Sequence, residues 1–344
     1  MFEALYFKSL EESKNFIASN HSKGILLFAS DQIVRDLSQY AGENVVLCST
    51  AGEFTKEGYK EEVITGFTYD RGVASIVELE NPSIRNINEL RKAYDKVKDN
   101  KNAFMLLLCN GLAAHEESII STFFFIKDDF KIVGGSSGDY LQFKETLIYI
   151  GKKKVDSVAI FFDCKSRTQL VKENIYKTTE KKLLVTEADP LSRTVYKFDN
   201  VPAATKYAQL IGIREEKLAD SFSNHPLGRV IKQNTYIASP MKVNPDKSIT
   251  FYSQILPNTF VDVLEPADLD NCFHNTINML EFKPTFIFSV HCILRSLKFK
   301  EEHSWGKLDS KLLQVCKNQS GFISYGEQIY KKHLNQTMVL LAIE

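Results

Sequence analysis

The sequence predicts an α/β fold in which repeated strand–helix–strand–hairpin units form two mixed-sheet domains. Short, continuous apolar runs such as residues 24–29 and 104–109 indicate strands that are buried on both faces. Helical segments with one apolar face alternate with these runs. Three strands end in a turn of small residues, then Gly, then an acid, within residues 46–53, 132–139 and 321–327. The recurrence of this ending indicates a repeated architecture.

The first unit is expected to contain a helix, a buried strand, a second helix, a strand that ends in the first acid turn, and a hairpin. These elements are predicted at residues 11–20, 24–29, the segment capped by Ser30 or Asp31, 45–48, and 63–69 paired with 73–79 across a turn at 70–72. The second unit repeats this order at residues 87–97, 104–109, 116–125, 132–135, and 146–150 paired with 155–162. The two copies, at about 24–80 and 103–163, predict an internal duplication.

A charged stretch at residues 163–199, poor in apolar runs, places a domain boundary there and gives domains at 22–195 and 196–344. Helices in the second domain are expected at 203–211, 214–221, 267–280 and 308–315, and strands at 236–238, 248–255, 259–264, 286–292, 322–324 and 338–343. From residue 286 onward, the order strand, helix, strand-turn, strand predicts a third and looser copy of the unit.

Composition excludes several classes of function. Lys plus Arg and Asp plus Glu each number 43, so the chain lacks the positive charge with which general nucleic-acid or anionic-membrane binders neutralise phosphates. No apolar run approaches the roughly 20 residues of a membrane span, and the N-terminus lacks a basic start followed by an apolar block. We therefore expect a cytoplasmic protein without membrane insertion. The six cysteines form no CxxC pair, which favours reduced thiols over a zinc site.

Several motifs resemble the FIST family. Two motifs resemble the FIST N-terminal domain. They are Cys48-Ser49-Thr50-Ala51-Gly52-Glu53 followed by Gly58-Tyr59, and Gly134-Gly135-Ser136-Ser137-Gly138-Asp139. The FIST C-terminal domain is resembled by His225-Pro226-Leu227, by residues 288–295 and by residues 321–327. The resemblance implies a signal-transduction sensor that binds a small molecule such as an amino acid. Some family members bind haem and sense nitric oxide. A histidine kinase, a cyclic-dinucleotide enzyme or a chemotaxis-type receptor would then be the separate partner protein.

The three acid turns are the predicted ligand site, because strand ends in open α/β sheets commonly form clefts. Backbone N–H groups exposed by small residues can bind a carboxylate, and the acids can receive an ammonium or hydroxyl group. Arg295, just after a strand, would suit a ligand carboxylate. The predicted ligand residues are Ser49, Thr50, Gly52, Glu53, Gly135, Ser136, Gly138, Asp139, Arg295, Tyr325, Gly326 and Glu327. The simpler alternative is that the glycines only allow the turns and the acids only cap backbone N–H groups.

Two rival functions remain open from the sequence. No cofactor is required, but His291, Cys292 or His225 could ligate the iron of a non-covalently bound haem in a nitric oxide sensor. An enzyme could use Ser49 or Ser136 with the acids, although neither serine lies in a Gly-x-Ser-x-Gly elbow and no catalytic residue is assigned. The glycine-rich turn at 134–139 has no following Lys, which argues against a phosphate-binding Walker loop.

Overall fold

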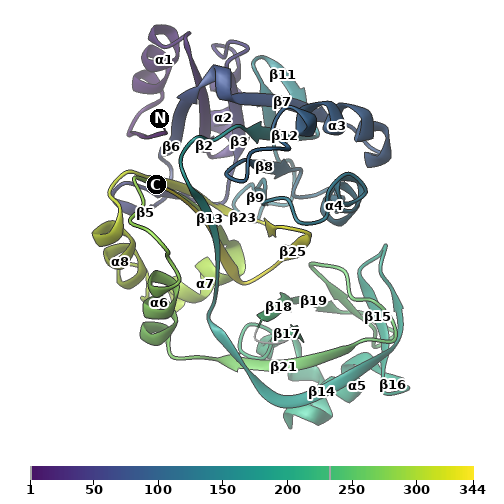
Figure 1. Ribbon diagram of the computed structural model, residues 1–344. Helices are drawn as coiled ribbons and strands as arrows, with labels where there is room; N and C mark the ends of the chain where they lie inside the picture. Colours follow the sequence, from purple (N-terminus) through teal and green to yellow (C-terminus); the bar gives the residue numbers. More distant parts are fainter. Residues whose placement is uncertain (1, 232–233) are drawn as a thin grey trace. The chain divides into compact units, whose positions relative to one another are not determined.

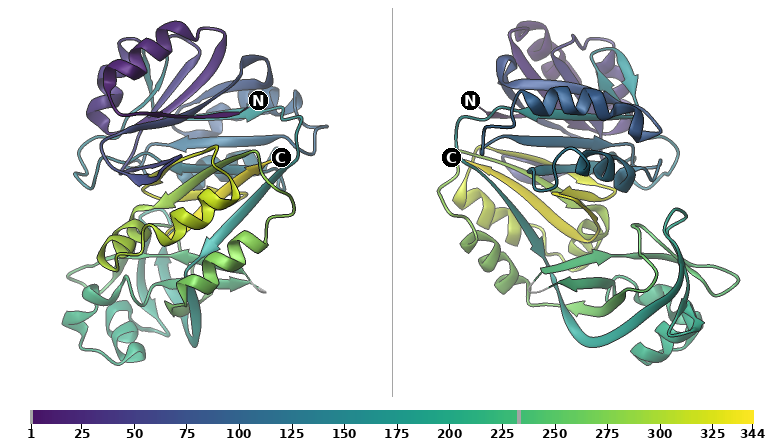
Figure 2. Two further views of the ribbon diagram at one scale, coloured as in Figure 1. Left: turned by 90° about the vertical axis from the view of Figure 1, so that its left-hand side faces the viewer. Right: turned by 45° about the vertical axis from the view of Figure 1, so that its right-hand side comes forward.

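The computed structural model of the protein describes residues 2–231 and 234–344, and the chain divides into two compact units (Figures 1 and 2). Unit 1 comprises the chain up to Glu173 together with Phe273–His333 and Met338–Glu344. Unit 2 comprises Asn174–Cys272 and Leu334–Thr337. The described residues form eight α-helices and 26 strands in several open sheets, so the predicted α/β class is confirmed.

Unit 1 contains three six-stranded sheets of one design. Sheet 1 consists of β1 (Glu3–Phe7), β6 (Ile64–Asp70), β2 (Lys23–Ala29), β3 (Val45–Ser49), β10 (Ile148–Ile150) and β11 (Lys153–Val155). Sheet 2 consists of β7 (Ala74–Leu79), β12 (Ser157–Phe162), β8 (Phe104–Cys109), β9 (Ile132–Ser136), β24 (Glu327–Ile329) and β25 (Lys332–Leu334). Sheet 3 consists of β13 (Thr168–Asn174), β26 (Thr337–Ile343), β22 (Phe286–Cys292), β23 (Gln319–Ser324), β4 (Glu53–Thr55) and β5 (Gly58–Lys60). In each sheet the two central strands are parallel: β2 with β3, β8 with β9, and β22 with β23.

The hairpin at the end of each sheet comes from a different repeat. Hairpin β4–β5 follows β3 in the chain but pairs with β23 in sheet 3. Hairpin β10–β11 follows β9 and pairs with β3, while β24–β25 follows β23, and its strand β24 pairs with β9. Each repeat therefore gives its hairpin to another repeat's sheet, and the exchange closes into a ring of three. The three sheets share this order of strands, which is the arrangement that three copies of one unit would produce. Most of unit 2 lies in the chain between β13 and β22, two strands of that third copy.

The helices of unit 1 follow the order set by the repeats. The first two repeats contribute α1 (Leu10–Ser19), α2 (Asp31–Ser38), α3 (Ile87–Asp95) and α4 (Glu116–Phe124), with the short 3₁₀ turns η1 (Arg71–Val73) and η2 (Ser83–Asn86). The third contributes α6 (Leu269–Asn278), α7 (Ile293–Glu301) and α8 (Lys307–Val315). Ser9 caps α1 by accepting a hydrogen bond from the Glu12 N–H.

The three sheets pack their inner faces together through aromatic side chains. Phe28 from sheet 1 stacks on Phe322 from sheet 3, with 4.6 Å between ring centroids. Phe2 lies against Phe162 from sheet 2 and Phe286 from sheet 3, each at 5.5 Å. Such aromatic pairs add about 0.5–1.5 kcal/mol beyond the area that they bury. The many phenylalanines of the sequence therefore form the shared core of the three repeats.

Two predicted hairpins are corrected by the structure. β6 and β7 do not pair with each other, because β6 lies in sheet 1 and β7 in sheet 2. Asp70 caps η1 between them by accepting the Gly72 N–H, and this turn carries the chain from one sheet to the next. The second hairpin exists only as β10–β11, since β12 continues into sheet 2. A turn signal between two strands thus marked a crossing between sheets.

Unit 2 is an antiparallel sheet with one α-helix among its described residues. Its strands are β18 (Asn234–Ala238), β17 (Leu227–Ile231), β21 (Phe260–Pro266), β14 (Tyr176–Asp189), β15 (Thr194–Phe198), β20 (Ile249–Phe251), β19 (Pro240–Val243) and β16 (Val201–Pro202). Helix α5 (Ala203–Ile211) packs on β15, and the predicted helix at 214–221 is instead two 3₁₀ turns, η3 (Glu215–Lys217) and η4 (Ala219–Ser221). Phe198, Tyr207 and Phe251 are among its buried core residues.

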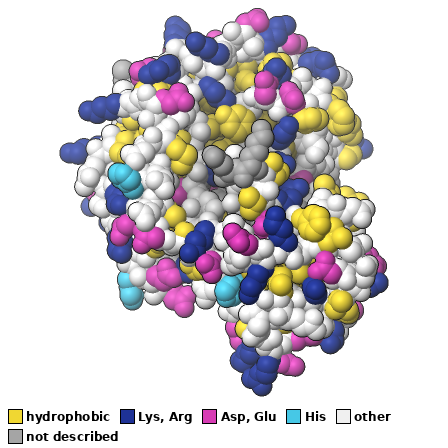
Figure 3. Space-filling model, turned by 60° about the horizontal axis from the view of Figure 1, so that its bottom comes forward, with side chains coloured by type: hydrophobic (Ala, Val, Ile, Leu, Met, Phe, Trp, Pro, Cys, Tyr) yellow, Lys and Arg dark blue, Asp and Glu magenta, His cyan; other side chains and the backbone are white. Residues whose placement is uncertain are grey.

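Charged side chains of both signs share the surface of the protein. Figure 3 shows Lys and Arg side chains intermixed with Asp and Glu side chains over the face that it draws, as expected from equal numbers of both. Within residues 2–231 and 234–344, no helix has both the length and the apolar character that crossing a membrane requires.

Candidate functional site

The three acid turns meet inside unit 1. Backbone hydrogen bonds link each turn to a neighbour: Gly138 N–H to Ser49 O at 3.0 Å, Ala51 N–H to Ile323 O at 3.0 Å, and Ser136 N–H to Gly326 O at 2.9 Å. The turns follow β3, β9 and β23, one of the two central strands in each sheet. At each turn the chain crosses from that sheet to another. The exchanged hairpins therefore bring together three sequence segments that are far apart in the chain.

Hydroxyl groups at equivalent positions of the turns each bind a buried carboxylate. Thr50 Oγ1 donates to Glu53 Oε1 at 2.7 Å, and Ser324 Oγ donates to Glu327 Oε1 at 2.8 Å. In the middle turn, Ser136 Oγ donates to Glu116 Oε1 at 2.7 Å instead of to Asp139. The first and third turns thus share one arrangement, and the second differs.

Ser49 ties two of the repeats together. Its hydroxyl donates to the Gly138 carbonyl and accepts the Leu147 N–H, both at 2.8 Å. The hydroxyl is fully buried and has both its donor and an acceptor position occupied. The geometry around Ser49 is that of a structural hydrogen-bond link.

The turn glycines are required by close packing. Gly52 has φ of 137° and Gly326 has φ of 158°, which are backbone conformations that residues with a side chain rarely adopt. A Cβ atom on Gly138 would lie 3.0 Å from the Ala51 nitrogen of the first turn, and one on Gly135 would lie 2.5 Å from Val290 Cγ1. These glycines let the turns and the central strands approach one another.

Glu53 is a buried acid held by hydroxyl groups. It is 0% exposed and begins β4. Besides Thr50, the Tyr140 hydroxyl donates to its two oxygens at 3.3 and 3.1 Å, and the Val63 N–H lies 3.5 Å from Oε2. Burial raises the pKa of Glu53 to about 8, although these hydrogen bonds act in the opposite direction. No Lys, Arg or His side chain of the described residues forms an ion pair with it.

Asp139 holds the loop that covers Glu53. Its carboxylate accepts hydrogen bonds from the Phe143, Lys144 and Glu145 N–H groups at 3.1, 2.7 and 3.1 Å, and from the Tyr325 hydroxyl. Burial alone would raise the pKa of Asp139, but these bonds outweigh it and lower the pKa. Asp139 is therefore an anion used to shape residues 140–145, hereafter the Tyr140 loop.

Glu327 and Tyr325 complete the third turn. Glu327 is fully buried at the start of β24, opposite Gly135 of β9. Tyr325 is half-buried, and its hydroxyl also accepts the Leu141 N–H at 2.6 Å. The third turn therefore supports the Tyr140 loop through Tyr325.

Arg295 lies in a different buried cluster, on α7 over sheet 3. It is 0% exposed and forms an ion pair with Glu173, whose side chain is 1% exposed. Its Nη1 donates to His291 Nδ1 at 3.3 Å, and its guanidinium lies 4.2 Å from the centroid of the Phe299 ring. The contacts of Arg295 are with these residues, so the structure does not bring it into the bonds that join the three turns.

The neighbours of His291 fix its proton. Because Arg295 can only donate, His291 Nδ1 accepts, and Nε2 donates to Ser289 Oγ at 2.9 Å. Burial and the Arg295 charge lower the pKa of His291 well below its usual value. With both ring nitrogens engaged and the ring fully buried, His291 does not fit an axial ligand of a haem.

The other two candidate haem ligands differ in setting. Cys292 is 1% exposed at the end of β22. His225 lies in unit 2, and its Nδ1 is buried without a hydrogen-bond partner among the residues that the structure describes. Across residues 2–231 and 234–344, no three His, Cys, Asp or Glu side chains are arranged to hold a metal ion. His225 is thus the candidate with a ring nitrogen to offer.

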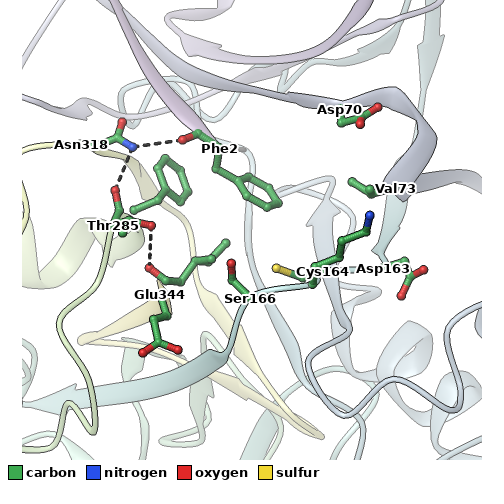
Figure 4. A pocket seen from close by; sticks show the side chains of 12 residues that line it. Phe2, Asp70, Val73, Asp163, Cys164, Ser166, Thr285, Asn318 and Glu344 are labelled. Carbon is green, nitrogen blue, oxygen red and sulfur yellow. Dashed lines mark hydrogen bonds between the residues drawn. The ribbon is translucent and has the colours of Figure 1, made fainter.

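A pocket of about 460 Å³ lies beside the residues at which β22 and β23 begin, and Figure 4 shows the side chains that line it. Its acids are already used. Asp70 accepts the Gly72 N–H at 2.9 Å, Asp163 accepts from the Asn100 amide at 2.6 Å, and Glu344 forms an ion pair with Arg167 at 2.7 Å. Asn318 closes one side by donating to the Phe2 and Thr285 carbonyls. The acids of this pocket therefore have partners that already satisfy their charge, whereas Glu53 is bound by hydroxyl groups.

Several residues that complete these sites were not among the predicted site residues. Tyr140 directly follows Asp139, so its position next to the second turn is a local signal for a site residue. Glu173 lies 122 positions from Arg295, and no local pattern links the two. Tyr59 and Trp305, which stack at 4.4 Å, come from a hairpin and a helix connection in different repeats.

Comparison with protein families agrees with this arrangement. Residues 23–201 match the FIST N domain, and residues 203–330 match the FIST C domain. No curated protein sequence matches the chain. The two domain matches together span most of the chain, which belongs to the FIST family of sensory domains in signal transduction.

Proposed function

We propose that this protein senses a small molecule with an ammonium group, of the amino-acid class, which binds at Glu53. The observation that carries the proposal is a fully buried carboxyl group bound by two hydroxyls, with no cation paired to it in the described residues. A buried acid of this kind stays largely protonated near neutral pH. An arriving ammonium group would favour its ionised form, because an opposite charge nearby lowers the pKa of a carboxyl group.

The Tyr140 loop is the part that would move to admit the ligand. Tyr140, Leu141 and Phe143 have φ angles of 54°, 64° and 52°, which are uncommon for residues other than glycine and store strain. Phe143 is 53% exposed although it is apolar, and its ring contacts Tyr325 at 5.4 Å. A ligand ammonium group that replaced the Tyr140 hydroxyl at Glu53 would break the bonds between the Tyr140 loop and Glu53, and the loop could then move away from this residue.

The proposal does not place a ligand carboxylate on Arg295, because that side chain is already paired with Glu173. The N–H groups of Ala51, Ser136 and Gly138 in the turns are likewise bonded to backbone carbonyls, so the proposed contact is the one between the ligand ammonium group and Glu53. Ligand binding would shift the equilibrium between closed and open forms of the loop. A separate protein, such as a histidine kinase, a cyclic-dinucleotide enzyme or a chemotaxis-type receptor, would respond to that shift.

The test is a thermal-shift screen of the twenty amino acids and of methylammonium chloride, followed by calorimetry on the compounds that raise the melting temperature. We expect Glu53→Gln to weaken binding by at least about tenfold, which corresponds to about 1.4 kcal/mol. Glu327→Gln is the matched control, since Glu327 has the equivalent hydroxyl partner but lacks Tyr140 over it. Tyr140→Phe should bind more tightly, because it removes the group that the ammonium replaces.

Equal affinity of Glu53→Gln and the unaltered protein would contradict the proposal. So would the absence of binding by every amine in the screen. A Soret band that appears on haem addition and is lost in His225→Ala would favour the nitric oxide sensor instead.

A further inference from the structure

Helix α7 holds both ends of the segment with which the chain leaves unit 1 and returns. Glu173 is the last residue before the chain enters unit 2, and Phe273 is the first on its return. Arg295 of α7 is paired with Glu173 in the protein interior. Phe299, one turn further along α7, meets the Phe273 ring edge-on at 5.8 Å. One helix therefore contacts the exit and the re-entry of the inserted segment Asn174–Cys272.

Hairpin β4–β5 reaches the connection that follows this helix. The hairpin begins with Glu53, and Tyr59, which lies opposite Phe54, stacks on Trp305 at 4.4 Å with 5° between the ring planes. The Tyr59 N–H donates to Asp309 Oδ2 at 2.9 Å. Trp305 lies between α7 and α8, and Asp309 lies in the first turn of α8. A shift of the hairpin would therefore act on the helices directly.

A second line of contacts joins the hairpin to the ion pair. The Phe54 ring, next to Glu53 in the chain, lies 4.7 Å from the His291 ring. His291 accepts the Arg295 hydrogen bond at 3.3 Å, and Arg295 is the partner of Glu173. Each step in this line is a direct contact between buried side chains.

The ladder that joins hairpin β4–β5 to sheet 3 is short, and the ion pair contains unsatisfied atoms. The register between β4 and β23 includes two residue pairs, Phe54 with Gly321 and Glu53 with Phe322. In the ion pair, Arg295 Nε and Glu173 Oε2 are buried without a hydrogen-bond partner among the described residues. A buried pair with unsatisfied atoms depends strongly on its geometry. Small movements of the hairpin would therefore have a measurable effect at Glu173.

We infer that hairpin β4–β5 and helix α7 couple the state of Glu53 to Glu173, and so to the ends of the segment that forms unit 2. The role of a ligand in this coupling rests on the proposed function, whereas the coupling itself belongs to the unliganded protein. Two sites and a shared mechanical element are what a sensor needs to convert binding into a change elsewhere.

Hydrogen exchange measured by mass spectrometry on the full chain tests this inference. Glu53→Ala removes the group that anchors the start of the hairpin, and we expect exchange at residues 172–174 to become several-fold faster. Glu327→Ala is the matched control, since its hairpin joins sheet 2, and it should leave these residues unchanged. Tyr140→Phe, which removes a single hydroxyl, replaces Glu53→Ala if the alanine variant does not fold.

The route is tested by repeating the measurement in a Trp305→Leu background. There the Glu53 substitution should change exchange at residues 172–174 less, because Trp305→Leu removes one of the two lines of contact. A Tyr94→Leu background should keep the whole effect, because Tyr94 is a half-buried aromatic residue of α3 that packs on Phe130 and belongs to neither line of contacts. Unchanged exchange at 172–174 in the Glu53 variants, or an effect that Trp305→Leu does not reduce, overturns the inference. Amine binding with unchanged exchange overturns the coupling alone, and altered exchange without any amine binding overturns the proposed ligand alone.

Discussion

A carboxyl group buried among hydroxyls, such as Glu53, makes stability depend on pH in the opposite direction from a salt-bridged carboxylate. Its pKa is about 8 in the folded protein, against an ordinary value of 4.5. Below about pH 4.5 the group is protonated in both states and has no effect. Between these values the unfolded chain loses the proton while the folded chain keeps it, so stability falls as pH rises.

Ionisation of Glu53 should therefore lower the stability of the protein at higher pH. Relative to Glu53→Gln, which cannot ionise, the free energy of unfolding of the unaltered protein should fall by a few kcal/mol between pH 5 and pH 8, since each pKa unit corresponds to about 1.4 kcal/mol. Urea denaturation of both proteins at the two pH values measures this difference. Parallel behaviour of the two proteins would show that Glu53 has an ordinary pKa.

At the scale of the element, the turn before β4 depends on a glycine. Gly52 has φ of 137°, and a Cβ atom there would lie 2.9 Å from Ile323 Cγ1 in the neighbouring turn. Gly212 ends α5 with φ of 79° and has no atom within 4 Å of such a Cβ. The two positions share a positive φ, but 137° lies farther from the left-handed region than 79° does, so Gly52 differs from Gly212 in both backbone strain and packing.

Gly52→Ala should therefore destabilise the protein more than Gly212→Ala. We expect about 1 kcal/mol for Gly212→Ala, from the backbone angle alone, and about 2–4 kcal/mol for Gly52→Ala, where overpacking adds to it. Thermal and chemical denaturation of the two variants compare them. Equal losses would mean that the turns can separate without cost, which contradicts their role in joining the sheets.

Elements and turns were predictable from sequence to the extent that their signals are local. Continuous apolar runs gave β2, β8 and β22, and the glycine-acid endings gave the three turns. The partners of strands were not predictable in the same way. The turn at Asp70-Arg71-Gly72 has the residues of a hairpin, yet β6 and β7 complete different sheets because their pairing is decided by distant strands. For the same reason, the Glu173 partner of Arg295 and the Trp305 partner of Tyr59 had no signal in the sequence.

At the scale of the molecule, the exchange of hairpins makes each repeat depend on the others. A ligand at Glu53 would touch the turn of the first repeat and the Tyr140 loop of the second, while the hairpin that starts at Glu53 belongs to the third sheet. Binding at this one residue would therefore involve all three repeats. Because the repeats depend on one another in this way, a small ligand at Glu53 could change the conformation of unit 1.

The central claim is that an ammonium group binds an acid that is protonated beforehand, and the number of protons released on binding tests it most directly. Calorimetric titration at pH 7 with an amino acid found in the screen, in phosphate and in Tris buffer, reports this number through the different ionisation heats of the buffers. We predict release of most of one proton by the unaltered protein and by Glu327→Gln. Binding with the same heat in both buffers would contradict the claim that the ligand meets a protonated Glu53.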